Sequence, residues 1–384
     1  MDRMKVIFFA SLLLIIYLHG GYALILFVME KLRGRDAASP DEDAEGSIAV
    51  VVGAYNEEAV IGKKIESLLA QTWKRPIRII VVSDCSTDAT DRIVESYSGR
   101  GVELRRPAKR QGKAANFSEI VPTLKEEIVI LTDASGVFAR DTVERLMGPL
   151  RDPSVGCVGG RIVYGNVDAT GISRSEGLYW RYEVLLRTLE SRPGGTVIIS
   201  GGCYAIRRSL FRPVPGELPD DSLSPLNVWD QGFRVAYAPD ALVHETMAET
   251  VEGEYRTKVR IISRNFVALM RMRHLLNPIR RPVLAWKLYS HRLLRWLVIP
   301  LLAVFLGANL ALLDGPLYQA VLVAQCTFYA AAVIGSLPAA RRWKIFQIPF
   351  YFCLVNLAAL AGVCRGLSGS VSGTWEPVER NPGR

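Results

Sequence analysis

The sequence has few of the residues that build disulfide frameworks and zinc sites. Six cysteines are spread over 384 residues without a C-x-x-C pair, and the four histidines form no cluster. The chain also lacks G-x-G-x-x-G and G-x-x-x-x-G-K-[ST], the glycine-rich motifs that cradle dinucleotide and nucleoside triphosphate phosphates. These absences argue against a disulfide scaffold, a zinc protein, a dinucleotide-binding protein and a P-loop protein. Scattered thiols are simplest to reconcile with a reducing, cytosolic setting.

Acidic residues are missing between Arg256 and Leu313. The chain has a formal net charge of +9, and eleven Lys and Arg lie between Arg256 and Arg295, so the rest of the sequence carries about −2 (9 − 11). This basic segment leads directly into apolar sequence, which favours anionic lipid headgroups over nucleic acid as its partner. We therefore expect contact with membrane lipids and no binding of nucleic acid.

Long apolar runs occur near both ends of the chain. Val6–Met29 is long enough to cross a bilayer and is followed by no small-residue cleavage site, which favours a retained anchor over a signal peptide. Three more runs are Leu293–Leu313, Leu317–Leu337 and Ile345–Val363. The basic connection 339–344 favours the cytoplasm, together with the central domain. We expect a multi-pass protein of the cell membrane whose catalytic domain is cytoplasmic, with both termini outside unless one run is re-entrant or interfacial.

A helical pattern precedes the first of these three runs. Apolar and basic side chains alternate there at helical spacing: Trp286, Leu288, Leu293 and Leu294 with Lys287, His291, Arg292 and Arg295. We expect an amphipathic helix that lies in the membrane interface with its cations at the level of the headgroups. A helix packed within the soluble domain is the alternative.

The central part of the chain alternates short apolar runs with helical patterns. We expect strands at Ile48–Ala54, Ile77–Val82, Val102–Arg105 and Ile128–Leu131, and helices over Glu57–Gln71, from Ser86 or Thr87, and from about Lys113. This alternation predicts an α/β domain with a parallel sheet covered by helices on both faces. Ligands bind such sheets beyond the carboxyl ends of the strands. Those ends carry acids, in "GAYNEE", "SDCSTD" and "TDASG", which suits the hydroxyls, base edge and metal of a nucleotide-sugar.

Six motifs occur in a characteristic order: "AYNEE", "SDCSTD", "RQGKAAN", "TDASG", "SGGCYAIRRSLF" and "PDDSLSP". In this order they resemble the membrane-bound family 2 glycosyltransferases, the group that includes cellulose, chitin and hyaluronan synthases. The resemblance runs from about Ser47 to the C-terminus. It implies a GT-A fold, Rossmann-like, and a glycosyltransferase that uses a nucleotide-sugar.

The expected organisation has six parts. They are an N-terminal transmembrane anchor (1–30), an acidic linker (31–46), a cytoplasmic GT-A domain (47–250), a basic amphipathic interfacial segment (251–292), three transmembrane helices (293–366) and a C-terminal tail (367–384).

On the donor side, the resemblance assigns Glu57 and Asp84 to the ribose and uracil of a UDP-sugar. A carboxylate accepts two hydrogen bonds, which suits a diol or a ring N–H. Helix capping is the alternative for both. Lys113 stands where a helix begins, so its ammonium and the free N–H groups suit a diphosphate. A solvated surface lysine is the alternative there.

The resemblance also implies a metal site with Mg2+ or Mn2+ on Asp133, bridging the diphosphate. The family's usual motif is D-x-D, and this chain has Ser135 in the second position. A serine hydroxyl ligates weakly or through a water, and hard cations keep several waters and need few carboxylates. His244, expected after the strand Val235–Tyr237 and a turn at Pro239-Asp240, is a further candidate ligand, with a structural role as the alternative.

The catalytic base implied by the resemblance is Asp221, which matches the final acid of the family's T-E-D motif. A carboxylate beside the acceptor hydroxyl takes its proton as the oxygen attacks the anomeric carbon, and direct displacement of this kind inverts the anomeric centre. Asp220 is the alternative, because adjacent side chains rarely face the same site.

On the acceptor side, Gly201, Gly202 and Cys203 resemble the loop that shapes the acceptor site, with a tight turn as the alternative. Arg264 is a partial match to the Q-x-x-R-W motif of processive synthases, whose Gln and Trp are missing here. The departure argues against long-chain synthesis.

We therefore expect an inverting glycosyltransferase that moves a sugar, UDP-linked by preference, to a carbohydrate or lipid-linked acceptor near the membrane, in the synthesis of cell-surface polysaccharide or glycolipid. The alternatives are a polyprenyl-phosphate sugar transferase and a catalytically inactive membrane protein that senses nucleotide-sugars or acts as a scaffold.

Overall fold

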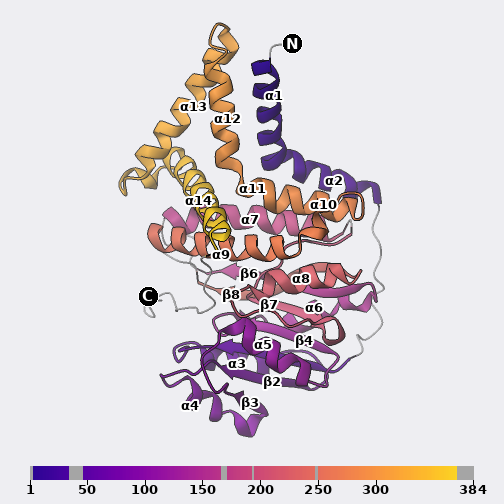
Figure 1. Ribbon diagram of the computed structural model, residues 1–384. Helices are drawn as coiled ribbons and strands as arrows, with labels where there is room; N and C mark the ends of the chain where they lie inside the picture. The colour runs from indigo at the N-terminus through magenta and orange to yellow at the C-terminus, as the bar shows by residue number, and fades with distance from the viewer. Residues whose placement is uncertain (1–2, 34–45, 166–170, 193, 247–249, 370–384) are drawn as a thin grey trace.

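Apolar helices extend from one side of an α/β domain in the computed structural model (Figure 1). The residues that the structure describes are 3–33, 46–165, 171–192, 194–246 and 250–369. Most of the acidic linker and of the C-terminal tail lie outside these residues, so the expectations for them stay predictions.

A single eight-stranded sheet forms the centre of the domain, in the order β3-β2-β1-β4-β7-β6-β8-β5. Its strands are β1 (Ile48–Ala54), β2 (Ile77–Ser83), β3 (Val102–Arg105), β4 (Ile128–Asp133), β5 (Val137–Phe138), β6 (Val155–Tyr164), β7 (Cys203–Arg207) and β8 (Arg234–Glu245). The strands predicted at residues 48–54, 77–82, 102–105 and 128–131 are present and parallel as expected, and the predicted strand Val235–Tyr237 is part of β8. The expected parallel sheet describes this half only: in the other half β8 is parallel to β6, but β7 runs antiparallel to β4 and β6, and β5 antiparallel to β8.

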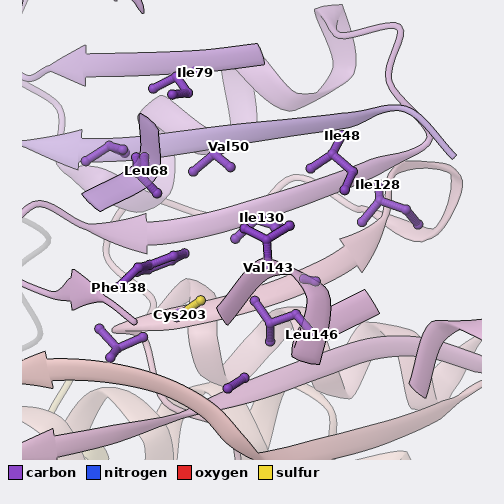
Figure 2. Close-up of a cluster of buried hydrophobic side chains, with 14 of the residues drawn as sticks. Ile48, Val50, Leu68, Ile79, Ile128, Ile130, Phe138, Val143, Leu146 and Cys203 are labelled. Carbon is purple, nitrogen blue, oxygen red and sulfur yellow. The ribbon is translucent and has the colours of Figure 1, made fainter. Parts of the chain in front are cut away.

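The sheet is buried on both faces because its central strands are apolar throughout. Along β1, Ile48, Val50 and Val52 belong to one core cluster, and Ala49 and Val51 to another on the opposite face. Figure 2 shows the first cluster, with side chains from β1, β2 and β4 packed against helix side chains. Burying a Val or Ile side chain contributes about 1.5–3 kcal/mol. This two-sided burial explains why the strands could be recognised as continuous apolar runs.

Short helices cover the two faces of the sheet. Helices α3 (Ile61–Leu69), α4 (Thr90–Glu95) and α6 (Thr142–Met147) supply side chains to the first cluster, and α5 (Lys113–Ile120) and α8 (Asp220–Asp230) pack on the other face. Helix α4 begins at Thr90, later than predicted, because Ser86 and Thr87 hydrogen-bond across to Asn56 instead of opening a helix. The expected turn before His244 is also absent: β8 is one strand with a shift in register opposite β6.

The apolar helices are long enough to cross a membrane. Three candidates are Arg3–Leu32, α13 (Pro316–Gly335) and α14 (Lys344–Leu367). The first contains α1 (Arg3–Ile16), a π-helical turn and α2 (Tyr22–Arg33). A fourth candidate joins the segment Pro282–Trp296, with α10 (Pro282–Leu288) and α11 (Leu294–Trp296), to α12 (Val298–Leu310) across a 71° bend, which is either a broken span or a re-entrant loop. These helices support association with a membrane; their orientation stays a prediction.

The expected placement of cations at the headgroups was wrong for part of the segment before α12. Lys287, His291 and Arg292 are all buried within the protein. They pack against α7 (Gly171–Ser191), whose carboxylates Glu183 and Glu190 both accept hydrogen bonds from His291. The alternative of a packed helix is the correct description for these side chains.

Lys64 is a fully buried cation on α3 that fixes the connection between β4 and β5. Its Nζ donates to Thr132 Oγ1 at 2.8 Å and to the carbonyl oxygen of Gly136 at 2.6 Å. Burial lowers the pKa of Lys64 to about 7, although the charges of Asp133 and Glu245 oppose the shift. The end of β4, which carries Asp133, is therefore held in place by an amine whose pKa is about 7.

We expect Lys64→Met to change the pH dependence of stability. In the unfolded chain this amine keeps its proton up to about pH 10.4, whereas in the folded protein it loses the proton near pH 7. The unfolded state thus binds more protons between these values, so the stability of the wild type should rise with pH across that window. The thermal unfolding midpoint in detergent should show this rise in the wild type and in Lys63→Met, a change of the exposed neighbour, but not in Lys64→Met. Parallel pH profiles for all three would contradict a neutral, buried Lys64.

Candidate active site

The acids predicted from the sequence lie at one edge of the sheet. In the parallel register Ala54 is opposite Ser83, and Gly53 is opposite Asp133. The loops after β1 and β2 and the end of β4 therefore meet at the carboxyl edge. The register therefore brings together the loops that carry the candidate residues, at the edge where ligands bind in sheets of this kind.

The first two loops are locked to each other in an unusual backbone conformation. Asn56 and Cys85 both have left-handed backbones, with φ of 51° and 61°. Non-glycine residues adopt this conformation at a cost and concentrate at functional sites. The side chain of Asn56 accepts from Thr87 N–H at 2.8 Å, and the backbone N–H of Glu57 donates to Thr90 Oγ1 at 2.8 Å. Glu57 is buried between these loops.

Asp84 positions the helix that follows β3. Its Oδ1 accepts from Gln111 N–H at 2.9 Å and from Asn116 Nδ2 at 3.0 Å, and its Oδ2 accepts from Gly112 N–H at 2.9 Å. Gly112 has a φ of 88°, which favours glycine. Asp84 thus fixes the start of α5, and with it the place of Lys113.

Lys113 lies at the centre of a group of carboxylates. Its Nζ is 2.7 Å from Asp133 Oδ1 and 3.3 Å from Asp220 Oδ1. Burial lowers the pKa of Lys113, but the charges of Asp133, Asp220 and Asp221 outweigh burial and raise the pKa above its ordinary value. The ammonium is therefore a permanent cation between the end of β4 and the start of α8.

Asp220 and Asp221 both lie near Lys113 at the first turn of α8. Asp220 Oδ1 is 3.3 Å from the ammonium, and the charge of Asp221 acts on the ammonium as well, so the choice of Asp221 over Asp220 stays a prediction. Asp220 is buried and accepts from Tyr204 Oη at 3.0 Å. Burial raises the pKa of Asp221, the charge of Asp220 adds to the rise, and Lys113 opposes it. A raised pKa suits Asp221 to the role of proton acceptor.

The glycine loop approaches Asp221 closely. A Cβ atom at Gly201 would lie 2.8 Å from Asp221 Oδ2 and 3.3 Å from Lys113 Nζ, so only glycine leaves both groups in place. Gly202 packs against Ile162, and Cys203 is buried as the first residue of β7. Gly201 is the member of this loop nearest the charged groups.

Two arginines of α9 (Val251–Arg271) reach the same region. Arg264 donates to the carbonyl oxygen of Glu217 at 2.9 Å, and burial lowers its pKa while the charge of Asp221 opposes the shift. Arg260 lies one turn earlier on α9. Burial and the charge of Arg264 lower its pKa, and the charges of Asp221 and Asp133 oppose the shift. Sequence reasoning chose Arg264 and missed Arg260, although their four-residue spacing places both on one face of a helix.

The residues predicted as metal ligands are only partly brought together. Ser135 Oγ donates to Glu245 Oε1 at 2.6 Å, so a carboxylate missed by sequence reasoning stands beside the serine that replaces the second acid. Because side chains alternate along a strand, His244 projects from the face of β8 opposite to Glu245. The described residues contain no group of three or more His, Cys, Asp and Glu able to hold an ion.

This donor set still fits a hard divalent cation in part. Asp133 offers a carboxylate, and Ser135 and Glu245 offer further oxygen atoms, the ligand type that Mg2+ and Mn2+ prefer. Mg2+ is usually bound by one or two carboxylates together with phosphate oxygens. The chain therefore provides an incomplete oxygen site that a diphosphate would complete.

Comparison with known proteins agrees with this geometry. Residues 49–214 match the model of the family described as "Glycosyl transferase family 2". The chain is 26% identical over 248 residues to an N-acetylglucosaminyltransferase of Azorhizobium caulinodans, and 27% identical over 267 residues to one of Rhizobium meliloti. These alignments cover 59% and 62% of this chain, and the chain spans 62% of the length of each relative.

A solved structure shares the fold over nearly the whole chain. It is a mannosyltransferase from Pyrobaculum calidifontis in complex with GDP-Man and Mn2+, with a TM-score of 0.67 and 23% sequence identity. The match covers 95% of this chain and 99% of that one. It supports the predicted GT-A-like fold.

We expect the Lys113 group to show strong coupling in a double-mutant cycle. Lys113→Met leaves Asp133, Asp220 and Asp221 without their shared cation and should destabilise the protein by about 2 kcal/mol, as expected for lost hydrogen bonds to charged groups. Asp220→Asn should destabilise the wild type but stabilise Lys113→Met, because it removes repulsion there. Thermal unfolding of the four proteins in detergent measures this.

Lys109→Met is the control, because Lys109 is an exposed lysine in the same loop. Additive effects of Lys113→Met and Asp220→Asn would contradict the central place of Lys113.

Proposed function

Because residues 49–214 match the model of glycosyl transferase family 2, we propose that the protein is an inverting glycosyltransferase. It moves a sugar from a nucleotide-sugar, UDP-linked by preference, to an acceptor hydroxyl close to the membrane, in the synthesis of cell-surface polysaccharide or glycolipid. The observation that supports this best is the Lys113 ammonium held between Asp133 and the paired acids Asp220 and Asp221.

On the donor side, Lys113 supplies positive charge for the diphosphate at the first position of α5. The start of a helix also favours an anion, because its first backbone N–H groups have no partner within the helix. Asp133 and Ser135, with Glu245 behind the serine, would hold Mg2+ or Mn2+ together with the diphosphate oxygens. A bound ion would neutralise the charge of the leaving nucleoside diphosphate. Glu57 and Asp84 lie in the loops that we assign to the ribose and uracil.

On the acceptor side, Asp221 takes the proton of the attacking hydroxyl. Burial and the charge of Asp220 raise its pKa, which strengthens it as a base near neutral pH. The hydroxyl oxygen forms a bond to the anomeric carbon as the bond from that carbon to the diphosphate breaks, so the electron pair leaves with the nucleotide. Attack from the face opposite the leaving group inverts the anomeric centre.

The acceptor enters beside the Gly201 loop and α9. Because Gly201 has no side chain, its loop can lie directly against Asp221, and Arg260 and Arg264 add positive charge to that side. We assign these residues, with Gly202 and Cys203, to the acceptor site. The first donor to test is UDP-N-acetylglucosamine, since two relatives are N-acetylglucosaminyltransferases, and GDP-mannose is the second.

We expect Asp221→Asn to lower kcat by about 10²–10⁴-fold, the usual contribution of a general base. UDP affinity should stay within a few-fold, since the amide keeps the size of the carboxylate and Lys113 keeps its bond to Asp133. Release of UDP from UDP-N-acetylglucosamine, in the presence of a membrane lipid extract that supplies acceptors, measures kcat.

The matched control is Asp220→Asn, which should lower kcat much less. Full activity of Asp221→Asn would favour a phosphate acceptor, because a phosphate scarcely needs a base. That result would support the alternative of a polyprenyl-phosphate sugar transferase. Donor binding without turnover in the wild type, for both donors, would favour the scaffold alternative.

A further inference from the structure

Most of the buried polar side-chain atoms that lack a hydrogen-bond partner, among the described residues, belong to one cluster. Five of the eight such atoms are Arg161 Nε, Arg187 Nε and Nη1, Arg292 Nε and the Tyr237 hydroxyl. The four residues come from β6, α7, the segment before α11, and β8. We call them the arginine cluster. Buried donors without partners are rare and expensive, so their concentration in one place requires an explanation.

Tyr237 lies within electrostatic reach of Arg187 and Arg161, and Arg292 within that of Arg187. Burial raises the pKa of the Tyr237 phenol, and the positive charges of Arg187 and Arg161 oppose the rise. Arg187 is 5% exposed, and its guanidinium stacks over the Trp180 ring at 4.8 Å. Stacking of this kind holds the plane of the guanidinium and leaves its N–H edge available.

The carboxylates beside the cluster are already engaged. Glu183 Oε1 binds Arg295 at 2.5 Å, its Oε2 accepts from His291 at 3.2 Å, and Arg187 Nη2 is 3.9 Å away, beyond hydrogen-bond distance. Glu190 accepts from His291 at 2.8 Å and from Tyr22 at 2.5 Å.

Positive charge is therefore in excess in this interior region. Among the described side chains its cations are Arg161, Arg187, Lys287, Arg292 and Arg295, and its acids are Glu183, Glu190 and Asp221, whose charge acts on Arg292. These cations exceed these acids by two (5 − 3), before any charge on His291. A buried charge is tolerated when a partner of opposite sign compensates it.

Water is a poor partner for this set of groups. Four of the five atoms are guanidinium nitrogens, which donate and do not accept. A water molecule accepts about two hydrogen bonds but must place two protons of its own, and it brings no charge. An oxyanion accepts several N–H bonds at once and neutralises the excess. Arginine is suited to phosphate because its planar fork donates two parallel hydrogen bonds.

The cluster also lies at the boundary between the membrane helices and the candidate active site. On α7 the exposed side chains Leu178 and Leu185 present an apolar surface, while Arg187 points inward. On the other side, Arg292 Nη1 donates to Ser222 Oγ at 2.6 Å, next to Asp221. An anion bound here would therefore be anchored at the level of the membrane surface and connected to the first turn of α8.

We propose that Arg161, Arg187, Tyr237 and Arg292 form a binding site for a phosphate group. The group is carried by a lipid headgroup or is free phosphate. This inference concerns binding and does not rest on the proposed sugar transfer.

The test uses the full chain in phosphatidylcholine nanodiscs and measures the thermal unfolding midpoint. One arm titrates inorganic phosphate against sodium chloride of the same ionic strength, and the other replaces part of the lipid with phosphatidic acid. We expect phosphate or phosphatidic acid, but not chloride, to raise the midpoint of the wild type. A response to phosphatidic acid alone identifies a headgroup, and a response to inorganic phosphate identifies free phosphate.

Two variants make the result specific. Tyr237→Phe removes a hydroxyl that has no partner in the described chain, so it should fold normally and weaken phosphate binding by about tenfold, one hydrogen bond to a charged group. Arg187→Met should lose the response to phosphate, and without phosphate its midpoint should stay close to that of the wild type, because Arg187 makes only a long ion pair of 3.9 Å with Glu183. Arg145→Met, a change of an exposed arginine on α6, should behave as the wild type.

Three results would overturn the proposal. They are an equal rise with chloride, the same response to phosphate in Tyr237→Phe and Arg187→Met as in the wild type, or no response of the wild type in either arm.

Discussion

The Lys113 ammonium holds together carboxylates that would otherwise repel one another at the edge of the sheet. Asp133 comes from the end of β4, and Asp220 and Asp221 from the first turn of α8, so the cation ties the two halves of the domain together. The surroundings are arranged around this group. A Cβ at Gly53 would lie 2.9 Å from Lys113 Cγ, so a glycine in β1 gives the lysine side chain its path. A bound diphosphate would compete with these carboxylates for the Lys113 ammonium.

Sequence reasoning predicted the half of the fold in which each signal is local. Strands β1, β2 and β4 are continuous apolar runs because helices cover both of their faces, and the acids that follow them had to meet once the strands were parallel. The antiparallel insertion of β7 between β4 and β6 depends on contacts between distant segments, and no periodicity reports these. The same limit applies to Glu245, whose contact with Ser135 joins residues 110 positions apart.

The segment before α12 shows how composition can mislead. A run of cations without acids, next to apolar sequence, is typical of contact with lipid headgroups. In this protein the compensating acids Glu183 and Glu190 lie on α7, about one hundred residues earlier in the chain, and draw His291 and Arg295 inward. The network extends through Arg292 to Ser222, so a membrane-side element contacts the helix that carries the proposed base. The segment before α12 and the candidate active site are thus physically connected.

The central claim is that the Lys113–Asp133 edge binds the diphosphate of a nucleotide-sugar with the help of a divalent ion. Calorimetric titration of the detergent-solubilised full chain with UDP, with and without Mn2+, tests it most directly when wild type and Asp133→Asn are compared. Our account predicts tight binding of UDP that requires both the metal and Asp133. Equal affinity without metal and in Asp133→Asn, or no binding of UDP at all, would contradict it.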